Sequence, residues 1–288
     1  MTAEATELVA ADGVALAATL FRPSPTTPRR AVLVAGALGI DQRFYAPFAR
    51  WLAERGDLVM TFDLRGIGAS RATQHARSLR GLDIDMLGWA RLDFAAAVAR
   101  LVDIAGVDIV VVGHSLGAHH AGMTDAKAQS RIARLVAVAA GSGWWRDWAP
   151  TSRRRAPLML HLAVPCLTPL YGYFPGRRLG MVGDLPAGAA LQWSRWCRHP
   201  GFAWGSEPER VLASLASARF PIHAFSFSDD EAMTEACTRN LFAAFVNARC
   251  EIEVVRPAAL GLAAIGHIGA FRGQAGAAVW PLIEAQLG

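Results

Sequence analysis

The chain has little charge and almost no lysine. Only 18% of its 288 residues are charged, and Lys127 is the single lysine among 29 basic residues. Hydrophobic residues make up 53% of the sequence, and a chain so rich in them can bury a large core. This composition excludes a disordered or fibrous protein. The length fits one α/β domain with room for an insertion.

Cysteine is scarce as well, and its spacing excludes the common metal and redox motifs. The four cysteines form no C-x-x-C pair and have no histidines at zinc-ligand spacing: Cys166, Cys197, Cys237 and Cys250. We expect free thiols of a cytoplasmic protein. The sequence predicts no metal site and no cofactor.

The sequence also lacks an evident leader and an unbroken membrane-spanning run. Residues 1–7 have neither the basic residues nor the apolar core of a signal peptide, which again favours a cytoplasmic location. Residues 156–176 are uncharged and long enough to cross a bilayer, but four prolines interrupt them. We interpret this stretch as a broken apolar lid over a pocket. Contact with a membrane surface is the alternative, and no stable insertion is expected.

The positive charge of the chain is concentrated in one region. The formal net charge is +5, yet residues 141–220 alone hold ten arginines against four acidic residues. A solvated face is the simplest interpretation, and attraction of anionic substrates or an anionic membrane surface is the alternative. No recognition fold or aromatic-interleaved basic stripe accompanies this charge, so nucleic acid is not an expected partner.

Strand and helix patterns alternate along most of the chain. Residues 7–21 predict a hairpin around an Asp-Gly turn. Further strands and helices are predicted in alternation, the strands at 31–35, 58–62, 107–112, 135–139, 221–228 and 251–255, and the helices at 44–55, 84–104, 118–123, 232–247 and 274–286. This order predicts an α/β fold with a doubly wound, mostly parallel sheet and helices on both faces.

The pattern changes between residues 141 and 220. Six of the nine tryptophans fall here, among prolines and glycines and without strand alternation. We therefore predict a core formed by residues 1–140 and 221–288, with an inserted, mainly helical cap at 141–220. The sequence does not indicate an oligomeric state.

A serine flanked by glycines stands where a predicted strand turns into a predicted helix. The turn is Gly113-His114-Ser115-Leu116-Gly117. Glycines two residues before and after the serine allow a turn tight enough to push its hydroxyl out to where a base can reach it. The pattern G-x-S-x-G in this setting predicts a nucleophile elbow with Ser115 as the nucleophile.

A serine hydroxyl needs a base to take its proton and an acid to orient that base. In doubly wound hydrolases the chain order is Ser, acid, His, with the acid after a late strand and the histidine after the last one. His267 follows the last predicted strand, and Asp229 and Asp230 follow the strand before it. We predict a catalytic triad of Ser115, Asp230 and His267. Asp229 is the alternative acid, or a helix N-cap beside it.

Backbone N–H groups are expected to stabilise the oxyanion of the reaction. One is the N–H of Leu116, directly after the nucleophile and at the N-terminus of a helix. The other is predicted in the loop after strand 31–35, where Ala37 lies between Gly36 and Gly39. We interpret the remaining histidines of the elbow region as packing or pocket-floor residues: His114, His119 and His120.

These motifs together resemble the α/β-hydrolase superfamily, in particular its serine aminopeptidase-like and lipase-like members. Residues 63–70 resemble the D-x-R-G-x-G-x-S turn, which has a structural role in that family. Three cap segments, 173–180, 184–188 and 193–200, resemble predicted bacterial α/β hydrolases of unestablished substrate. One departure is Ala35, which stands where the family usually has the histidine of a His-Gly pair.

We therefore predict a serine hydrolase that cleaves an ester or thioester through an acyl-enzyme on Ser115. The aromatic, uncharged stretch of the cap favours a small hydrophobic substrate with an apolar acyl or aryl group. Two alternatives use the same triad, namely an amidase or aminopeptidase and a C–C bond hydrolase. A third is a non-catalytic protein of this fold that binds a small hydrophobic ligand. A dehalogenase or epoxide hydrolase is disfavoured, since those relatives usually have an aspartate at the position of Ser115.

Overall fold

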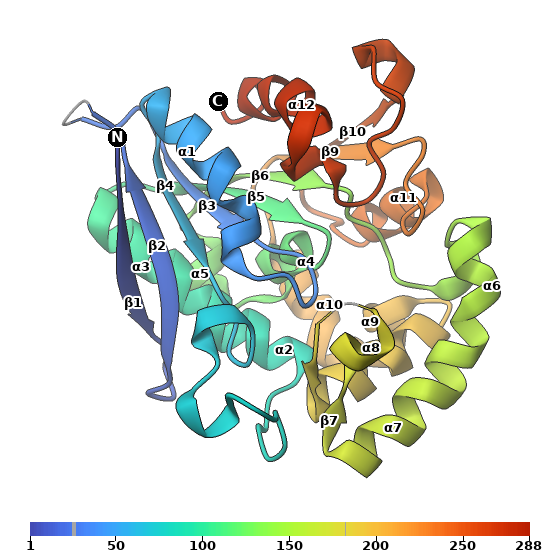
Figure 1. The fold of residues 1–288 in the computed structure, drawn as a ribbon. Coiled ribbons are helices and arrows are strands. Elements are labelled where there is room, and N and C mark those ends of the chain that lie inside the picture. The colour runs from blue at the N-terminus through green and yellow to red at the C-terminus, as the bar shows by residue number, and fades with distance from the viewer. Residues whose placement is uncertain (25–26, 182) are drawn as a thin grey trace.

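The computed structural model describes residues 1–24, 27–181 and 183–288. Its centre is an eight-stranded sheet with the strand order β1-β2-β4-β3-β5-β6-β9-β10 (Figure 1). β2 is antiparallel to both β1 and β4, and the other neighbouring pairs are parallel. The strands are β1 (Thr2–Val9), β2 (Ala15–Arg22), β3 (Ala31–Ala35), β4 (Leu58–Phe62), β5 (Ile109–His114), β6 (Ile132–Val138), β9 (Ile222–Phe227) and β10 (Cys250–Val255). The predicted doubly wound, mostly parallel sheet is confirmed.

Helices cover both faces of this sheet (Figure 1). On one face, α1 (Ala46–Glu54) and α12 (Gly273–Ala285) pack against one set of alternating strand residues, which includes Val32 and Val34. The intervening residues, such as Leu33, pack on the other face in the cluster that contains α3 (Ala95–Ala105). Since β3 is buried on both faces, its sequence is a continuous apolar run rather than an alternating one.

The remaining core helices lie on the face of α3. They are α2 (Met86–Gly88), α4 (Leu116–Met123), α5 (Ala126–Gln129) and α11 (Glu235–Ala243). A π-helical segment, Trp89–Phe94, joins α2 to α3, so the predicted helix at 84–104 exists with one irregular turn. Short 3-10 helices occur at Gln42–Tyr45, Gly68–Ser70, Thr73–His75, Trp145–Asp147, Gly176–Leu179, Pro257–Leu260 and Gly269–Phe271.

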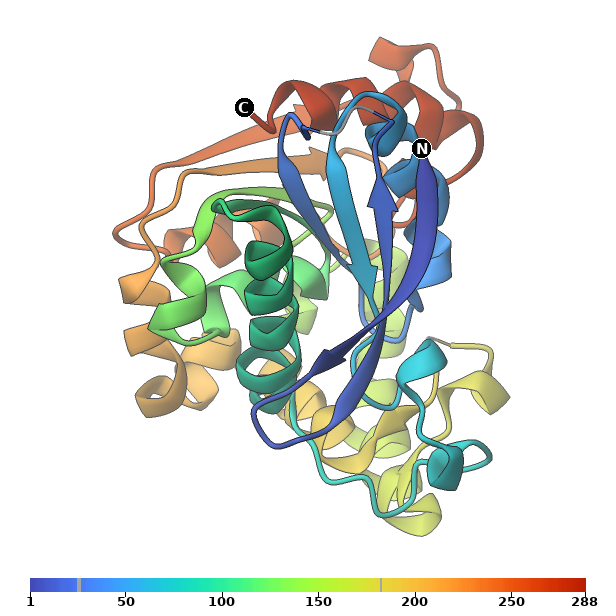
Figure 2. The same cartoon turned by 90° about the vertical axis from the view of Figure 1, so that its left-hand side faces the viewer.

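The predicted N-terminal hairpin forms one edge of the sheet. β1 and β2 pair along their whole lengths, from Thr2 opposite Arg22 to Val9 opposite Ala15. Gly13 in the turn has φ +82°, a left-handed conformation that glycine adopts without a steric penalty. Figure 2 faces this edge and shows the twist of the hairpin across the rest of the sheet.

Residues 139–221 connect β6 to β9 and are mainly helical, as expected for the insertion. They lie beyond the ends of the central strands, at the lower right of Figure 1. A two-stranded antiparallel ribbon of β7 and β8 accompanies the helices. The elements are α6 (Pro150–Leu158), α7 (Val164–Tyr171), β7 (Tyr173–Phe174), β8 (Leu185–Pro186), α8 (Ala187–Arg198), α9 (Phe202–Ser206) and α10 (Pro208–Ser217).

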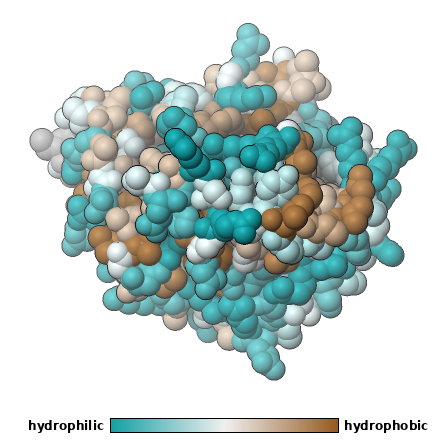
Figure 3. Space-filling model, turned by 60° about the horizontal axis from the view of Figure 1, so that its bottom comes forward, coloured by the Kyte–Doolittle hydropathy of each residue, from teal (hydrophilic) through white to brown (hydrophobic). Residues whose placement is uncertain are grey.

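The stretch expected to be broken by prolines is instead helical from Pro150 to Tyr171. A π-helical turn, Met159–Ala163, joins α6 to α7. It ends two residues before Pro165, whose missing N–H would interrupt an ordinary α-helix. One side of the stretch is buried, and three leucines on the other side are exposed: Leu158, Leu162 and Leu170. Figure 3 shows hydrophobic groups among hydrophilic ones on this lower side of the molecule. In the described ranges, no helix is long and apolar enough to cross a membrane.

The last helix of the insertion, α10, packs against the core. Leu215 lies against Gly122 of α4, so closely that a Cβ on this glycine would come within 2.9 Å of the leucine side chain. Gln129 of α5 donates to the carbonyl of Ser214 at 3.0 Å. α10 thus occupies the position of a crossover helix between the parallel strands β6 and β9.

Candidate active site

Ser115 has an unusual backbone conformation between β5 and α4. Its φ of +50° and ψ of −114° lie in a region that residues with a side chain rarely adopt. The surrounding structure fixes this conformation, because the N–H of Ser115 donates to the carbonyl of Val138 at 2.9 Å. The strained turn holds the serine side chain at the N-terminal end of α4.

The two glycines of the G-x-S-x-G pattern are required by packing. A Cβ on Gly113 would lie 2.6 Å from the backbone of Ala118, because α4 folds back closely over the end of β5. A Cβ on Gly117 would overlap the carbonyl oxygen of Ala35, at the end of β3. Each glycine therefore allows α4 to approach a neighbouring strand.

The structure brings Ser115, His267 and Asp230 into one line of hydrogen bonds. The Oγ of Ser115 lies 3.1 Å from Nε2 of His267, and Nδ1 of the same ring lies 2.8 Å from Oδ2 of Asp230. The Asp230 residue is only 5% exposed, so its carboxylate is shielded from water. This is the arrangement in which a histidine can take a proton from a serine.

Three consecutive acidic residues after β9 hold different parts of the histidine loop. Asp230 also accepts the N–H groups of Ala232 and Met233, at 2.7 and 2.8 Å. Asp229, the alternative acid, turns instead to the backbone and accepts the N–H groups of residues 265 and 266 at 2.8 and 3.1 Å. Glu231 accepts the N–H of His267 at 2.9 Å. Sequence reasoning missed Glu231, since nothing in its pattern marks a contact with a backbone N–H.

His114 lies beneath the triad and fixes the position of His267. It is fully buried, and its Nε2 donates to the carbonyl of His267 at 2.9 Å. The hydroxyl of Tyr45 donates to Nδ1 of His114 at 2.8 Å. Burial, followed by the charge of His267, lowers the pKa of His114 to about 3. His114 is therefore a neutral positioning residue, which agrees with the interpretation of it as a packing residue.

The two predicted oxyanion donors differ in their surroundings. Leu116 is the first residue of α4, so its N–H has no acceptor within the helix. Ala37 follows β3 as predicted, but its N–H donates to the hydroxyl of Tyr45 at 2.8 Å. The N–H of Ala37 can donate to an oxyanion only if its hydrogen bond to Tyr45 is weakened or replaced.

The D-x-R-G-x-G-x-S turn after β4 is hydrogen-bonded to the loop after β3. Asp63 accepts the N–H of Gln42 at 2.7 Å and that of Ala69 at 2.9 Å. Burial raises the pKa of Asp63. Arg65 in the same turn pairs with the buried Asp93 at 2.6 Å. In the described structure these bonds join the turn to the loop after β3 and to Asp93, and none of them involves a residue of the predicted triad.

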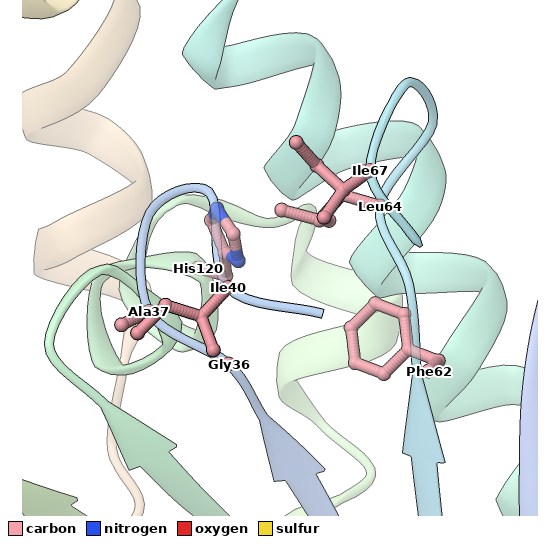
Figure 4. A pocket seen from close by; sticks show the side chains of 7 residues that line it. All are labelled: Gly36, Ala37, Ile40, Phe62, Leu64, Ile67 and His120. Atoms are coloured by element: carbon pink, nitrogen blue, oxygen red, sulfur yellow. The ribbon is translucent and has the colours of Figure 1, made fainter. Parts of the chain in front are cut away.

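A small pocket lies beside Ala37 (Figure 4). The loop after β3 forms one wall, and the end of β4 with its following loop forms the other. The cavity has a volume of about 10 Å³ and is lined by Gly36, Ala37, Ile40, Phe62, Leu64, Ile67 and His120. All of these residues except His120 present apolar or backbone groups.

The histidines of α4 are both buried. Nε2 of His119 donates to the carbonyl of Gly141 at 3.1 Å, whereas His120 faces the pocket. Burial lowers the pKa of His119 to about 4 and that of His120 to about 3. Over the described residues, no group of three or more His, Cys, Asp or Glu side chains is placed to hold a metal ion.

The insertion is attached to the loop that carries Asp230. The hydroxyl of Thr234 donates to the carbonyl of Asp147 at 2.7 Å, and the side chain of Asn240 donates to the Asp147 carboxylate at 2.7 Å. Farther along the insertion, the rings of Trp148 and Trp193 stack with their centroids 6.4 Å apart. The insertion therefore begins beside the loop that carries the predicted triad acid.

Comparison with known proteins gives both a family and structural relatives. The family described as serine aminopeptidase, S33, matches residues 26–248. A search of curated proteins finds no match to this chain.

Three solved structures illustrate the structural likeness. The esterase domain of a Rhodothermus marinus protein is 18% identical, with a TM-score of 0.60 over 99% of this chain and 96% of that one. The thioesterase domain from the curacin biosynthetic pathway is 16% identical, with a TM-score of 0.57 over 99% and 100%. Est816, described as an N-acyl homoserine lactone degrading enzyme, is 15% identical, with a TM-score of 0.61 over 98% and 100%. At these identities the likeness shows the shared fold.

Proposed function

The chain belongs to the serine aminopeptidase S33 family of α/β hydrolases, and from this premise we propose that it is a serine hydrolase that cleaves esters or thioesters with an apolar acyl or aryl group. The observation that carries the proposal is the hydrogen-bonded line Ser115–His267–Asp230 at 3.1 and 2.8 Å. The strained backbone of Ser115 supports it, because strain of this kind clusters at active sites.

The proposed reaction begins at Ser115. Nε2 of His267 takes the hydroxyl proton while Oγ attacks the substrate carbonyl. Asp230 holds the ring through Nδ1 and stabilises the imidazolium that forms. The oxyanion is stabilised by the N–H of Leu116 and, once Tyr45 releases it, by the N–H of Ala37.

The second half of the reaction releases the acyl group. The imidazolium of His267 gives its proton to the leaving oxygen or sulfur, which departs and leaves an acyl-enzyme on Ser115. A water molecule then loses a proton to Nε2 and attacks the acyl carbonyl, and the proton returns to Oγ. This sequence consumes one water and needs no cofactor.

The surroundings favour an apolar acyl group over a peptide with a free amino terminus. An aminopeptidase would need a carboxylate to face the substrate ammonium group. The cap stretch 156–176, which is predicted to cover the site, contains no acidic residue.

The test is a fluorophosphonate probe together with p-nitrophenyl esters of increasing chain length. We expect the probe to label the wild type and not Ser115→Ala, and His267→Ala to lose nearly all ester hydrolysis. Equal activity of wild type and His267→Ala would rule out the triad. Labelling that persists in Ser115→Ala would place the nucleophile elsewhere.

One observation favours a second candidate, a non-catalytic protein that binds a small hydrophobic ligand. The N–H of Ala37 is already bonded to Tyr45, which leaves Leu116 as the only predicted oxyanion donor with a free N–H. This candidate predicts no fluorophosphonate labelling of the wild type and no hydrolysis of any ester in the series.

A further inference from the structure

His120 is a buried histidine with no protein partner for its ring. The residue is 1% exposed, and neither Nδ1 nor Nε2 has a hydrogen-bond partner among the described residues. Its closest aromatic neighbour is Phe94, with the ring centroids 5.9 Å apart. Buried polar side-chain atoms nearly always have a partner, so two open nitrogens on one ring point to a ligand group.

The ring lies at the wall of the pocket beside Ala37. In Figure 4 the imidazole of His120 is next to the loop that carries Ala37 and Ile40, and Leu64 and Ile67 lie across the pocket. No other side chain that lines the pocket has a polar atom. His119, the next residue before it, is bonded to the carbonyl of Gly141 and does not line this pocket.

The pocket is sized for a single small group. Its volume of about 10 Å³ is close to the minimum that holds one water-sized group. An alkyl tail would not fit, whereas one hydroxyl or keto oxygen would. A neutral imidazole has one donor and one acceptor nitrogen, so it can bond either kind of oxygen.

The pocket also lies beside one of the two proposed oxyanion donors. His120 is four residues after Leu116, whose N–H is the proposed oxyanion donor, so the two lie on the same side of α4 about 6 Å apart along its axis. Ala37, the other proposed donor, lines the pocket itself. A group in the pocket therefore lies on the side of the site where the oxyanion is proposed to form.

We propose that His120 binds an oxygen on the second or third carbon of the acyl group, and that the substrates are hydroxyacyl or oxoacyl esters or thioesters. This inference rests on the proposed hydrolase function and names the substrate class of the same site. His120 is then a specificity-determining residue: it contacts the substrate but neither moves a proton nor touches the reacting atoms.

The test compares two N-acetylcysteamine thioesters, butyryl and 3-hydroxybutyryl, the latter as each enantiomer. Wild type is expected to show a kcat/KM about tenfold higher for one hydroxyacyl enantiomer than for butyryl, the size expected for one buried hydrogen bond. In His120→Leu this ratio is expected to fall to about one, while hydrolysis of the butyryl thioester continues. His120→Gln keeps a donor and an acceptor and should restore part of the preference. His119→Gln, which lies outside the pocket, is the matched control and should keep the full ratio.

Binding to Ser115→Ala separates this proposal from the hydrolase proposal. In that background we expect calorimetry to show tighter binding of the 3-hydroxybutyryl thioester than of the butyryl thioester, and the added His120→Leu change to abolish the difference. Preferential binding without turnover by wild type would retain the His120 site and overturn the hydrolase. Equal binding of the two thioesters, or a preference unchanged in both His120 variants, would overturn the role of His120.

Discussion

The side-chain hydroxyl of Tyr45 accepts the N–H of Ala37 at 2.8 Å. The same hydroxyl donates to His114, and His114 donates to the carbonyl of His267. One chain of hydrogen bonds therefore links the proposed oxyanion loop after β3 to the loop of the proposed catalytic base. Burial raises the pKa of Tyr45, so the hydroxyl keeps its proton and the direction of the chain is fixed.

Tyr45→Phe removes the acceptor that competes for the Ala37 N–H. If Ala37 is an oxyanion donor, kcat on p-nitrophenyl butyrate should rise about two- to tenfold, because the freed N–H bonds the oxyanion alone. The free energy of unfolding should fall by about 1–3 kcal/mol, since His114 loses its partner in a buried site. Steady-state kinetics and urea unfolding measure the two effects. A kcat that falls or stays constant would show that the second oxyanion donor is a group other than the N–H of Ala37.

Replacing each acid by its amide separates the roles of Asp230 and Asp229. Asp230→Asn should lower kcat by about 10³–10⁴-fold, because the ring of His267 loses the group that fixes its tautomer and stabilises its charge. Asp229→Asn keeps an oxygen that accepts the two backbone N–H groups, so its effect should stay near tenfold or less. Ester hydrolysis by the two purified variants measures both, with circular dichroism to verify folding. A larger loss of kcat in Asp229→Asn than in Asp230→Asn would identify Asp229 as the acid that orients His267.

Gly117→Ala should prevent the elbow from forming in its present shape. The added methyl group would overlap the carbonyl oxygen of Ala35, so α4 must move away from β3. We expect a loss of about 3 kcal/mol or more in the free energy of unfolding, within the range for an overpacked core. Gly269→Ala is the matched control, since the nearest atom to its new methyl group is 3.6 Å away. Thermal and urea unfolding should separate the two variants, and equal stabilities would contradict the packing argument.

Acid should destabilise the protein through its buried histidines. Burial lowers the pKa of His114 to about 3, of His119 to about 4 and of His120 to about 3. Histidines of an unfolded chain titrate near 6.5, so below this pH the unfolded state binds protons that the folded state does not. The free energy of unfolding should therefore fall as pH drops from about 6.5 toward 4, by about 1.4 kcal/mol per pH unit for each histidine.

Urea unfolding of wild type and His120→Gln at several pH values between 7 and 4.5 measures this effect. The free energy of unfolding should fall with decreasing pH in both proteins. Its slope against pH should be smaller in His120→Gln by the contribution of one histidine. Identical slopes would mean that His120 takes up its proton over the same pH range in the folded and the unfolded protein. That result would also contradict its neutral state in the pocket.

The sheet and the serine turn could be predicted because their causes are local. β3, β4 and β5 are buried on both faces, so each is a continuous apolar run that stands out in the sequence. The need for Gly113 and Gly117 arises within a few residues of Ser115, so the motif itself carries the information. His267 and the pair Asp229 and Asp230 could be placed by the order of the strands.

Other parts of the site depend on contacts between distant segments. The sequence could not separate Asp229 from Asp230, because adjacent residues differ only in the direction of their side chains after folding. The contacts of Tyr45 and Glu231 are with backbone N–H groups, which carry no mark in a sequence. The helical run from Pro150 to Tyr171 was unexpected, since a π-helical turn accommodates its prolines and no pattern of residues predicts that turn.

The position of α10 between β6 and β9 indicates which part of the insertion can be replaced. β6 and β9 are adjacent and parallel, and α10 already supplies the helix that such a pair needs. A segment exchanged between Asp147 and α10 would leave in place both the register of the sheet and the contacts of Asp147 with Thr234 and Asn240. Chimeras that join Asp147 to α10 through a foreign segment would thus test whether this segment sets the selectivity of the proposed nucleophile.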